Sequence, residues 1–237
     1  MAISASIEEE TRPLIAEDPA PAAGRQLASH DRGSRRLSAE GPDPTPREQL
    51  QAPAWDLPEL AGRLTELSAR PGATALLSWA ADLLWKAQQR EEPAAWVSAH
   101  AAPFFPPDFA AAGIDLAALP FIRTNDAAAA ARAADKLLRS GAFGLVIVDL
   151  GAGALLPTPL LGRLLGLARA HNAAVVFIAE ERSDATSLAP IISLRLTTSR
   201  RRVAPDRFAC TIEAIKDKRR GPGWTLTEHL RGPAGLR

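Results

Sequence analysis

The residues of greatest chemical interest lie on the segment Ser68–Thr74, which reads SARPGAT and follows a predicted strand at 63–68. A phosphate-binding loop of pattern GxxxxGK, followed by Ser or Thr, wraps backbone N–H groups around phosphates. Its lysine reaches the terminal phosphates and its hydroxyl holds Mg²⁺. Gly72 and Thr74 fit this pattern, but Ala73 occupies the lysine position and the first glycine is missing. The segment therefore indicates the remnant of a nucleotide site that lacks the groups needed to bind a nucleotide.

A second candidate is Asp149, which ends the apolar run LVIVDL. Nucleotide-hydrolysing proteins place an aspartate at the end of a buried strand, where it helps to hold Mg²⁺. Many strands of α/β proteins end in Asp, so a loop-capping role for Asp149 is the alternative.

A third feature is a local excess of positive charge near the C-terminus. The whole chain has 28 Lys and Arg against 27 Asp and Glu, but nine basic residues face three acidic ones between Arg195 and Arg220. Such a region suits phosphate contacts with nucleic acid or nucleotide, and the alternative is an edge strand protected from aggregation by its charge. The candidate residues are Arg200, Arg201, Arg202, Lys216, Lys218, Arg219 and Arg220.

Composition narrows the class of protein. The single cysteine, Cys210, excludes a disulfide framework and a cysteine-cluster zinc site, and the four histidines are scattered, so no metal site is predicted. Cys210 lies in an alternating segment and is predicted to be a small buried apolar residue. No run of 18 apolar residues occurs and the N-terminus lacks the features of a secretory signal, so we expect a cytoplasmic protein.

The chain is predicted to have two parts. Residues 1–53 contain seven prolines and no sustained apolar period, which predicts a disordered arm with one short helix near Ile7–Ile15. This arm is either a passive tail or a segment that binds a partner. Residues 54–237 are predicted to form one core domain.

The core domain alternates predicted strands and helices. Two of the strands, 144–150 and 173–179, are apolar on both faces, as in a parallel sheet covered by helices. The last three segments alternate apolar with polar residues and are predicted to be antiparallel strands at one edge, separated by the turn-like segments SRRRVAPD and KDKRRGPG. The predicted strands are 63–68, 94–98, 119–123, 144–150, 173–179, 192–198, 207–215 and 224–230, and the helices are 74–89, 126–140 and 159–171.

From Gly62 to about Leu230 the chain resembles the RecA recombinase core, and it most resembles the RecA-like ImuA accessory proteins of bacterial mutagenesis cassettes. The matching runs are GRLTELS, AAWVSAH, AAAGIDLAALPFIRT, DKLLRSGAFGLVIVDL, ARAHNAAVVFIAEER and IEAIKDKRRGP. The resemblance implies a RecA-like α/β P-loop core with a degenerate P-loop, a largely parallel sheet flanked by helices, and antiparallel C-terminal edge strands.

Position by position, the resemblance implies a vestigial nucleotide site. Ala73 replaces the P-loop lysine and His100 replaces the glutamate that activates water, whereas Asp149 survives. Lys216 and Lys218 match two lysines that cross the RecA filament interface to a neighbouring nucleotide. The chain is therefore expected to be neither an enzyme nor dependent on a cofactor.

The function implied is that of a non-catalytic adaptor in SOS-induced translesion DNA synthesis, associated with the nucleoid. Its implied partners are an ImuB-like inactive Y-family polymerase, an error-prone polymerase and RecA. The alternative is a RecA paralogue that still binds ATP with Mg²⁺ and DNA and acts in recombinational repair. A third hypothesis is a DNA-binding module that acts through Arg200–Arg202 and Lys216–Arg220.

Overall fold

A computed structural model of the protein describes residues 52–69, 75–99, 104–152, 154–180 and 188–231. All of them belong to the second of two compact units of the chain, Pro46–Arg237. The arm expected at 1–53, with its helix near Ile7–Ile15, lies outside the described residues except for Ala52 and Pro53, so it stays a prediction.

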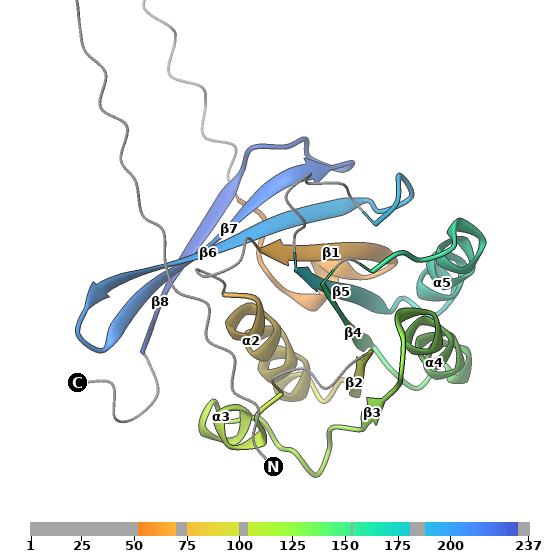
Figure 1. Ribbon diagram of the computed structural model, residues 1–237, viewed down its shortest axis with the longest axis horizontal. Coiled ribbons are helices and arrows are strands. Elements are labelled where there is room, and N and C mark those ends of the chain that lie inside the picture. The colour runs from red at the N-terminus through yellow and green to blue at the C-terminus, as the bar shows by residue number, and fades with distance from the viewer. Residues whose placement is uncertain (1–51, 70–74, 100–103, 153, 181–187, 232–237) are drawn as a thin grey trace, which may run out of the picture. The chain divides into compact units, whose positions relative to one another are not determined.

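The centre of this unit is an eight-stranded sheet of order β3-β2-β4-β5-β1-β6-β7-β8 (Figure 1). The six strands β3, β2, β4, β5, β1 and β6 pair in parallel with their neighbours, while β7 is antiparallel to both β6 and β8. The predicted α/β architecture with antiparallel strands at the C-terminal edge is confirmed. The strands are β1 (Arg63–Ala69), β2 (Ala94–Ser98), β3 (Phe121–Arg123), β4 (Leu145–Ala152), β5 (Ala174–Glu180), β6 (Leu194–Ala204), β7 (Arg207–Asp217) and β8 (Thr225–Arg231).

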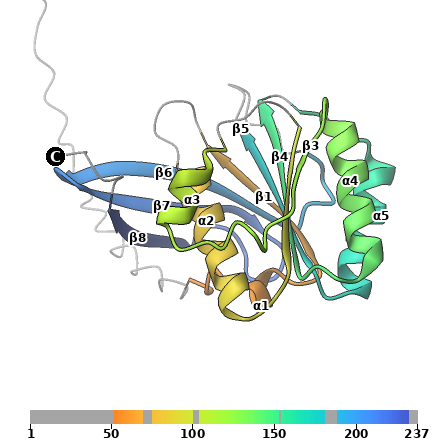
Figure 2. The same cartoon turned by 90° about the horizontal axis from the view of Figure 1, so that it is seen from below.

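Helices cover both faces of the parallel part of the sheet. Figure 2 shows α2 (Leu76–Gln89) and α3 (Pro106–Ala111) on one face, and α4 (Ala127–Ser140) and α5 (Thr158–Ala170) on the other. A short helix, α1 (Leu57–Leu60), precedes β1. No helix in the described ranges is long and apolar enough to cross a membrane.

Helix α4 ends as its sequence predicts. The side chain of Asp126 accepts a hydrogen bond from the Ala129 amide at 2.6 Å, which satisfies a donor left over at the first turn. Gly141 follows the helix with φ +67°, a left-handed conformation that glycine adopts without a steric penalty. These two residues fix the length of the helix and therefore the position of the chain that enters β4.

Apolar side chains form one core layer on each face of the sheet. In β4, Leu145 and Ile147 join the layer under α2, whereas Val146 and Val148 join the layer under α4 and α5. Successive side chains of a strand point to opposite faces, so a continuously apolar strand supplies both layers. This explains why these runs carry no polar alternation.

One predicted connection was wrong. The segment SRRRVAPD was predicted to be a turn, but β6 continues to Ala204 and β7 begins at Arg207, so only Pro205 and Asp206 connect them. Arginine side chains are compatible with strand backbone here because Arg200, Arg201 and Arg202 are all exposed. The β6–β7 hairpin and β8 project away from α4 and α5 in both views (Figures 1 and 2).

Candidate functional site

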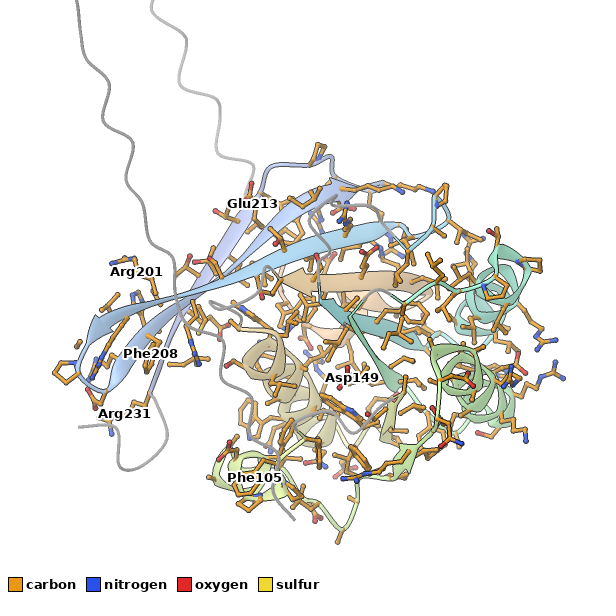
Figure 3. The ribbon with its side chains drawn as sticks, in the orientation of Figure 1. Phe105, Asp149, Arg201, Phe208, Glu213 and Arg231 are labelled. Atoms are coloured by element: carbon orange, nitrogen blue, oxygen red, sulfur yellow. The ribbon has the colours of Figure 1, made fainter. Side chains whose placement is uncertain are left out.

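The predicted nucleotide site is only partly described. Gly72, Ala73, Thr74 and His100 lie outside the described residues, so their geometry stays a prediction. Asp149 lies near the carboxyl end of β4 (Figure 3), and β1 and β4 are separated by β5. The carboxyl ends of these parallel strands share one edge of the sheet, which is where open α/β sheets bind ligands.

The Asp149 side chain is buried at 5% exposure. Its Oδ1 accepts a hydrogen bond from the Gly151 amide at 3.3 Å, and the pairing of β4 with β5 shifts register between these two residues. The neighbouring residue on β2 is Ser98, which is also buried. The loop-capping role considered for Asp149 therefore matches its contact with Gly151.

The first described residue before α2 is bonded within the protein. The Ala75 amide donates to the Thr198 hydroxyl of β6 at 3.3 Å. On β1, the Ser68 hydroxyl donates to the Leu196 carbonyl at 3.1 Å. In a working phosphate loop the amides at this helix N-terminus point at the ligand. Here the Ala75 amide instead fastens the start of α2 to β6.

The basic segment KDKRRGP, which begins in the last two residues of β7 and continues into the turn after it, is also engaged within the chain. The ammonium groups of Lys216 and Lys218 both donate to the Pro190 carbonyl, at 3.0 and 3.1 Å. Burial, together with the neighbouring Lys218 charge, lowers the pKa of Lys216. The two lysines fasten the end of β7 to the segment that leads into β6, and their predicted contact with DNA or a filament neighbour stays a prediction.

The two arginines of the same turn contact α1. The Arg219 guanidinium donates to the carbonyls of Glu59 and Ala61, at 3.0 and 3.2 Å. Arg220 forms an ion pair with the Glu59 carboxylate at 2.7 Å. Arg219 and Arg220 of the segment KDKRRGP therefore hold the turn against α1, the helix that precedes β1.

A buried ion pair that sequence reasoning missed positions this turn. Arg63, at the start of β1, contacts the Asp217 carboxylate at 2.6 Å, and the two side chains are 3% and 0% exposed. The Trp224 indole N–H donates to the other oxygen of Asp217 at 3.2 Å. Burial alone would raise the pKa of Asp217, but bonds from the Arg219 amide, Arg63 and Trp224 outweigh it and lower that pKa. Residues so far apart in sequence give no local signal of this pairing.

The three arginines of β6 differ in their contacts. Arg200 lies over the Phe208 ring, 5.1 Å from its centroid. Arg202 donates to the carbonyls of Ala204 and Pro205 in the hairpin turn. Arg201 is exposed and has no hydrogen bond or ion pair among the described residues. The three predicted basic residues therefore do not form one group, because each has a different environment.

The described residues contain no group of three or more His, Cys, Asp and Glu side chains placed to hold a metal ion. Cys210 is buried, as predicted, and burial raises the pKa of its thiol. The sequence matches no protein-family model, and no curated protein matches it.

Proposed function

We propose that this chain is a non-catalytic, RecA-like adaptor in SOS-induced error-prone translesion DNA synthesis. It binds an ImuB-type inactive polymerase homologue, works beside an error-prone polymerase and modulates RecA filaments. The observation that carries the proposal is Ala73, which stands at the phosphate-binding lysine position between β1 and α2. The chain keeps the strand and helix of a nucleotide site while its sequence lacks the cation that would hold the nucleotide.

The topology of the sheet supports a RecA-like core with a degenerate P-loop. β1 lies between β5 and β6, and α2 leads from β1 to β2 on the far side of β4. After β1 the chain builds β2 to β5 on one side of β1, and it then crosses to β6 on the other side. Such a reversal of strand order is a switch point of the kind at which α/β proteins bind ligands. Asp149 lies near the carboxyl end of β4, at the same edge.

The hydrogen bonds support a structural use of groups that would otherwise bind phosphate. The Ala75 amide is bonded to Thr198, and Lys216 and Lys218 are bonded to the Pro190 carbonyl. The single N–H of Ala75 would have to leave Thr198 before it could bind a phosphate, and the bonds to Pro190 hold the two lysines at the end of β7. An adaptor does not need that exchange, because its binding energy comes from buried surface.

Exposed aromatic side chains support a role in binding a protein. Trp79 is in the core, but Trp85 on the same helix is 41% exposed, and Phe105 at the start of α3 is 57% exposed. Tryptophan is enriched among the residues that dominate protein interfaces. We assign the α2–α3 surface, defined by Trp85 and Phe105, as the partner-binding surface of the adaptor.

A thermal-shift titration tests the absence of nucleotide binding. Ligand at 100 times its Kd stabilises a native protein by about 2.7 kcal/mol, which raises Tm by about 5–11 °C in a domain of this size. We expect no shift with ATP or a non-hydrolysable analogue in the presence of Mg²⁺. A saturable shift that Asp149→Asn abolishes would instead support the ATP-binding paralogue.

Partner capture tests the adaptor itself. We expect the full chain to capture a purified ImuB-type protein or RecA, and we expect Trp85→Ala with Phe105→Ala to reduce that capture at least tenfold. Leu155→Ala removes another exposed apolar side chain, 82% exposed, outside the α2–α3 surface and serves as the matched control. Failure of the chain to capture either partner would refute the adaptor function.

A further inference from the structure

Strands β6, β7 and β8 carry three arginines whose side chains have no partner among the described residues. They are Arg201 on β6, Arg207 on β7 and Arg231 on β8, and all three are exposed. Figure 3 shows Arg201 and Arg231 at the end of the three strands that projects away from α4 and α5. This group overlaps the sequence-predicted basic residues only at Arg201.

The strand register brings these arginines to one face of the sheet. Arg207 pairs directly with Arg231, and two residues further along β7, Ala209 pairs with Arg201 on one side and His229 on the other. Paired residues share a face and residues two apart on a strand return to it. The two rows of basic side chains are therefore about 7 Å apart, which is twice the rise per residue of a strand.

The opposite face of these strands is the one that packs toward α2. Cys210 and Ile212 belong to the core layer that includes Trp79 of α2. Phe208 packs partly against the same layer and lies under Arg200. The face with Arg201, Arg207 and Arg231 is therefore the outer face, and its residues Ser199, Thr227 and His229 are exposed as well.

Hydroxyl groups continue the outer face toward the middle of the strands. Ser199 pairs with Thr211, and Thr211 pairs with Thr227, with 2.8 Å between the two threonine hydroxyl oxygens. Guanidinium and hydroxyl groups are the donors that proteins use most for nucleic-acid phosphates. Ala209, small and between two basic residues, leaves the centre of the face flat.

Two observations favour nucleic acid over an acidic protein. The paired rows of the face have no Phe, Tyr, Trp or large aliphatic side chain, and the nearest one is Val203, 40% exposed at the irregularity of β6. Valine is under-represented among the residues that dominate protein interfaces, so the face offers a protein no strong anchor. The one carboxylate in the paired rows is Glu213, which lies beyond the hydroxyl row, and the hairpin turn adds a single further carboxylate, Asp206, against the three arginines. A flat face of cations and hydroxyls fits a repeating polyanion.

We propose that the outer face of β6–β8, defined by Ser199, Arg201, Arg207, Thr227, His229 and Arg231, binds the phosphodiester backbone of nucleic acid without sequence preference. No Phe, Tyr or Trp side chain lies in these rows, and guanidinium groups are phosphate donors, so we assign the contacts to phosphates and not to bases. This inference is independent of the adaptor function, because its test contains neither ImuB nor RecA.

The test is the salt dependence of binding, measured by fluorescence anisotropy with the full chain. The probes are a labelled single-stranded oligonucleotide and a labelled duplex of mixed sequence. The slope of log K against log salt changes by about 0.9 for each duplex phosphate contacted and by about 0.7 for each single-strand phosphate. Alanine at Arg201, Arg207 and Arg231 together should therefore reduce the slope by about 2.7 on duplex or about 2.1 on single strand.

A matched control removes the same charge elsewhere. Arg132 and Lys136 on α4 and Arg169 on α5 are exposed and carry no ion pair among the described residues, so their triple alanine variant should keep the wild-type slope. Asp206→Asn should tighten binding severalfold because Asp206 is exposed in the hairpin turn directly before Arg207 and its carboxylate is the nearest to the basic rows. Circular dichroism and Tm establish that each variant is folded.

Each outcome of this test either supports or overturns the proposal. Loss of slope only in the Arg201, Arg207 and Arg231 variant supports the proposal, and the probe that shows it identifies single strand or duplex as the ligand. Equal loss in both triple variants would mean a diffuse charge effect and would overturn it. The proposal would also be overturned if the wild type did not bind DNA at low salt. It would likewise be overturned if the triple arginine variant changed the salt slope for polyglutamate but not for DNA.

Discussion

Asp217 joins three parts of the fold through one carboxylate. Oδ1 contacts Arg63 of β1 and accepts the Arg219 amide at 2.9 Å, while Oδ2 accepts the Trp224 indole N–H. Arg63 has two further bonds, to the hydroxyl and the carbonyl of Ser193. Replacing Asp217 by alanine removes the carboxylate but leaves the arginine charge buried.

The size of the effect follows from this arrangement. Breaking a buried ion pair by removing one partner costs about 3–5 kcal/mol, because the remaining charge is uncompensated. For a domain of this size that corresponds to a fall in Tm of about 6–20 °C. The bonds from Arg63 to Ser193 persist, so we expect the loss of stability in Asp217→Ala to lie near the lower end of this range.

The assay is urea denaturation of the wild type, Asp217→Ala, and a double variant in which Arg63→Met accompanies Asp217→Leu. Both variants leave the Trp224 N–H and the Arg219 amide without their acceptor, at about 1–3 kcal/mol for each buried donor, but only the double variant also removes the buried arginine charge. It should therefore be more stable than Asp217→Ala. A cost below about 1 kcal/mol for Asp217→Ala, or a double variant no more stable than Asp217→Ala, would refute the reasoning.

The pH dependence supplies an independent check of the same pair. The folded-state pKa of Asp217 is held below its ordinary value of 3.8. A carboxylate with a lowered folded pKa stabilises the native state above its ordinary pKa, and this stability is lost as pH falls through the folded value. Asp217→Asn should therefore flatten the fall in stability between about pH 5 and pH 2, and an unchanged profile would contradict the assignment.

Three further changes test the packing around this framework. Asp126→Ala removes the cap of α4 and should cost about 1 kcal/mol in urea denaturation, whereas Asp126→Asn should cost less because it keeps an acceptor. Gly141→Ala should cost at least about 1 kcal/mol, since φ is +67° and a Cβ would meet the His171 ring at 3.0 Å; a neutral result would contradict the left-handed cap. Phe177→Ala empties a fully buried site in β5 and should cost about 3–5 kcal/mol, whereas a cost below about 1 kcal/mol would mean that this core layer is loosely packed.

The strands and helices of the parallel half could be predicted because their signals are local. Residues 145–148 of β4 and 174–179 of β5 are all apolar, and α4 is flanked by a capping Asp126 and a terminating Gly141. β2 was predicted to the residue, at 94–98. In all of these elements the local propensity and the pattern of burial favour the same secondary structure. A short window of sequence is therefore enough to predict each element.

The hairpin between β6 and β7 shows where local patterns fail. Arg200–Arg202 resemble a solvated turn in composition, yet their backbone is strand because β7 supplies the hydrogen-bond partners. A charged segment of an exposed edge gains its conformation from the neighbouring strand and not from burial of its own side chains. The sequence contains no local mark of that pairing.

The sequence by itself determined the alternating α/β order, the excess of basic residues after Leu194 and the alanine at the phosphate-binding position. Only the tertiary structure decided which cations are engaged. Lys216 and Lys218 are used by Pro190, and Arg219 is used by α1, whereas Arg201 gathers with Arg207 and Arg231 on one open face. The physical reason is that a side chain's charge is set by its type, but its hydrogen-bond partners are set by strand register and by contacts between residues distant in the chain.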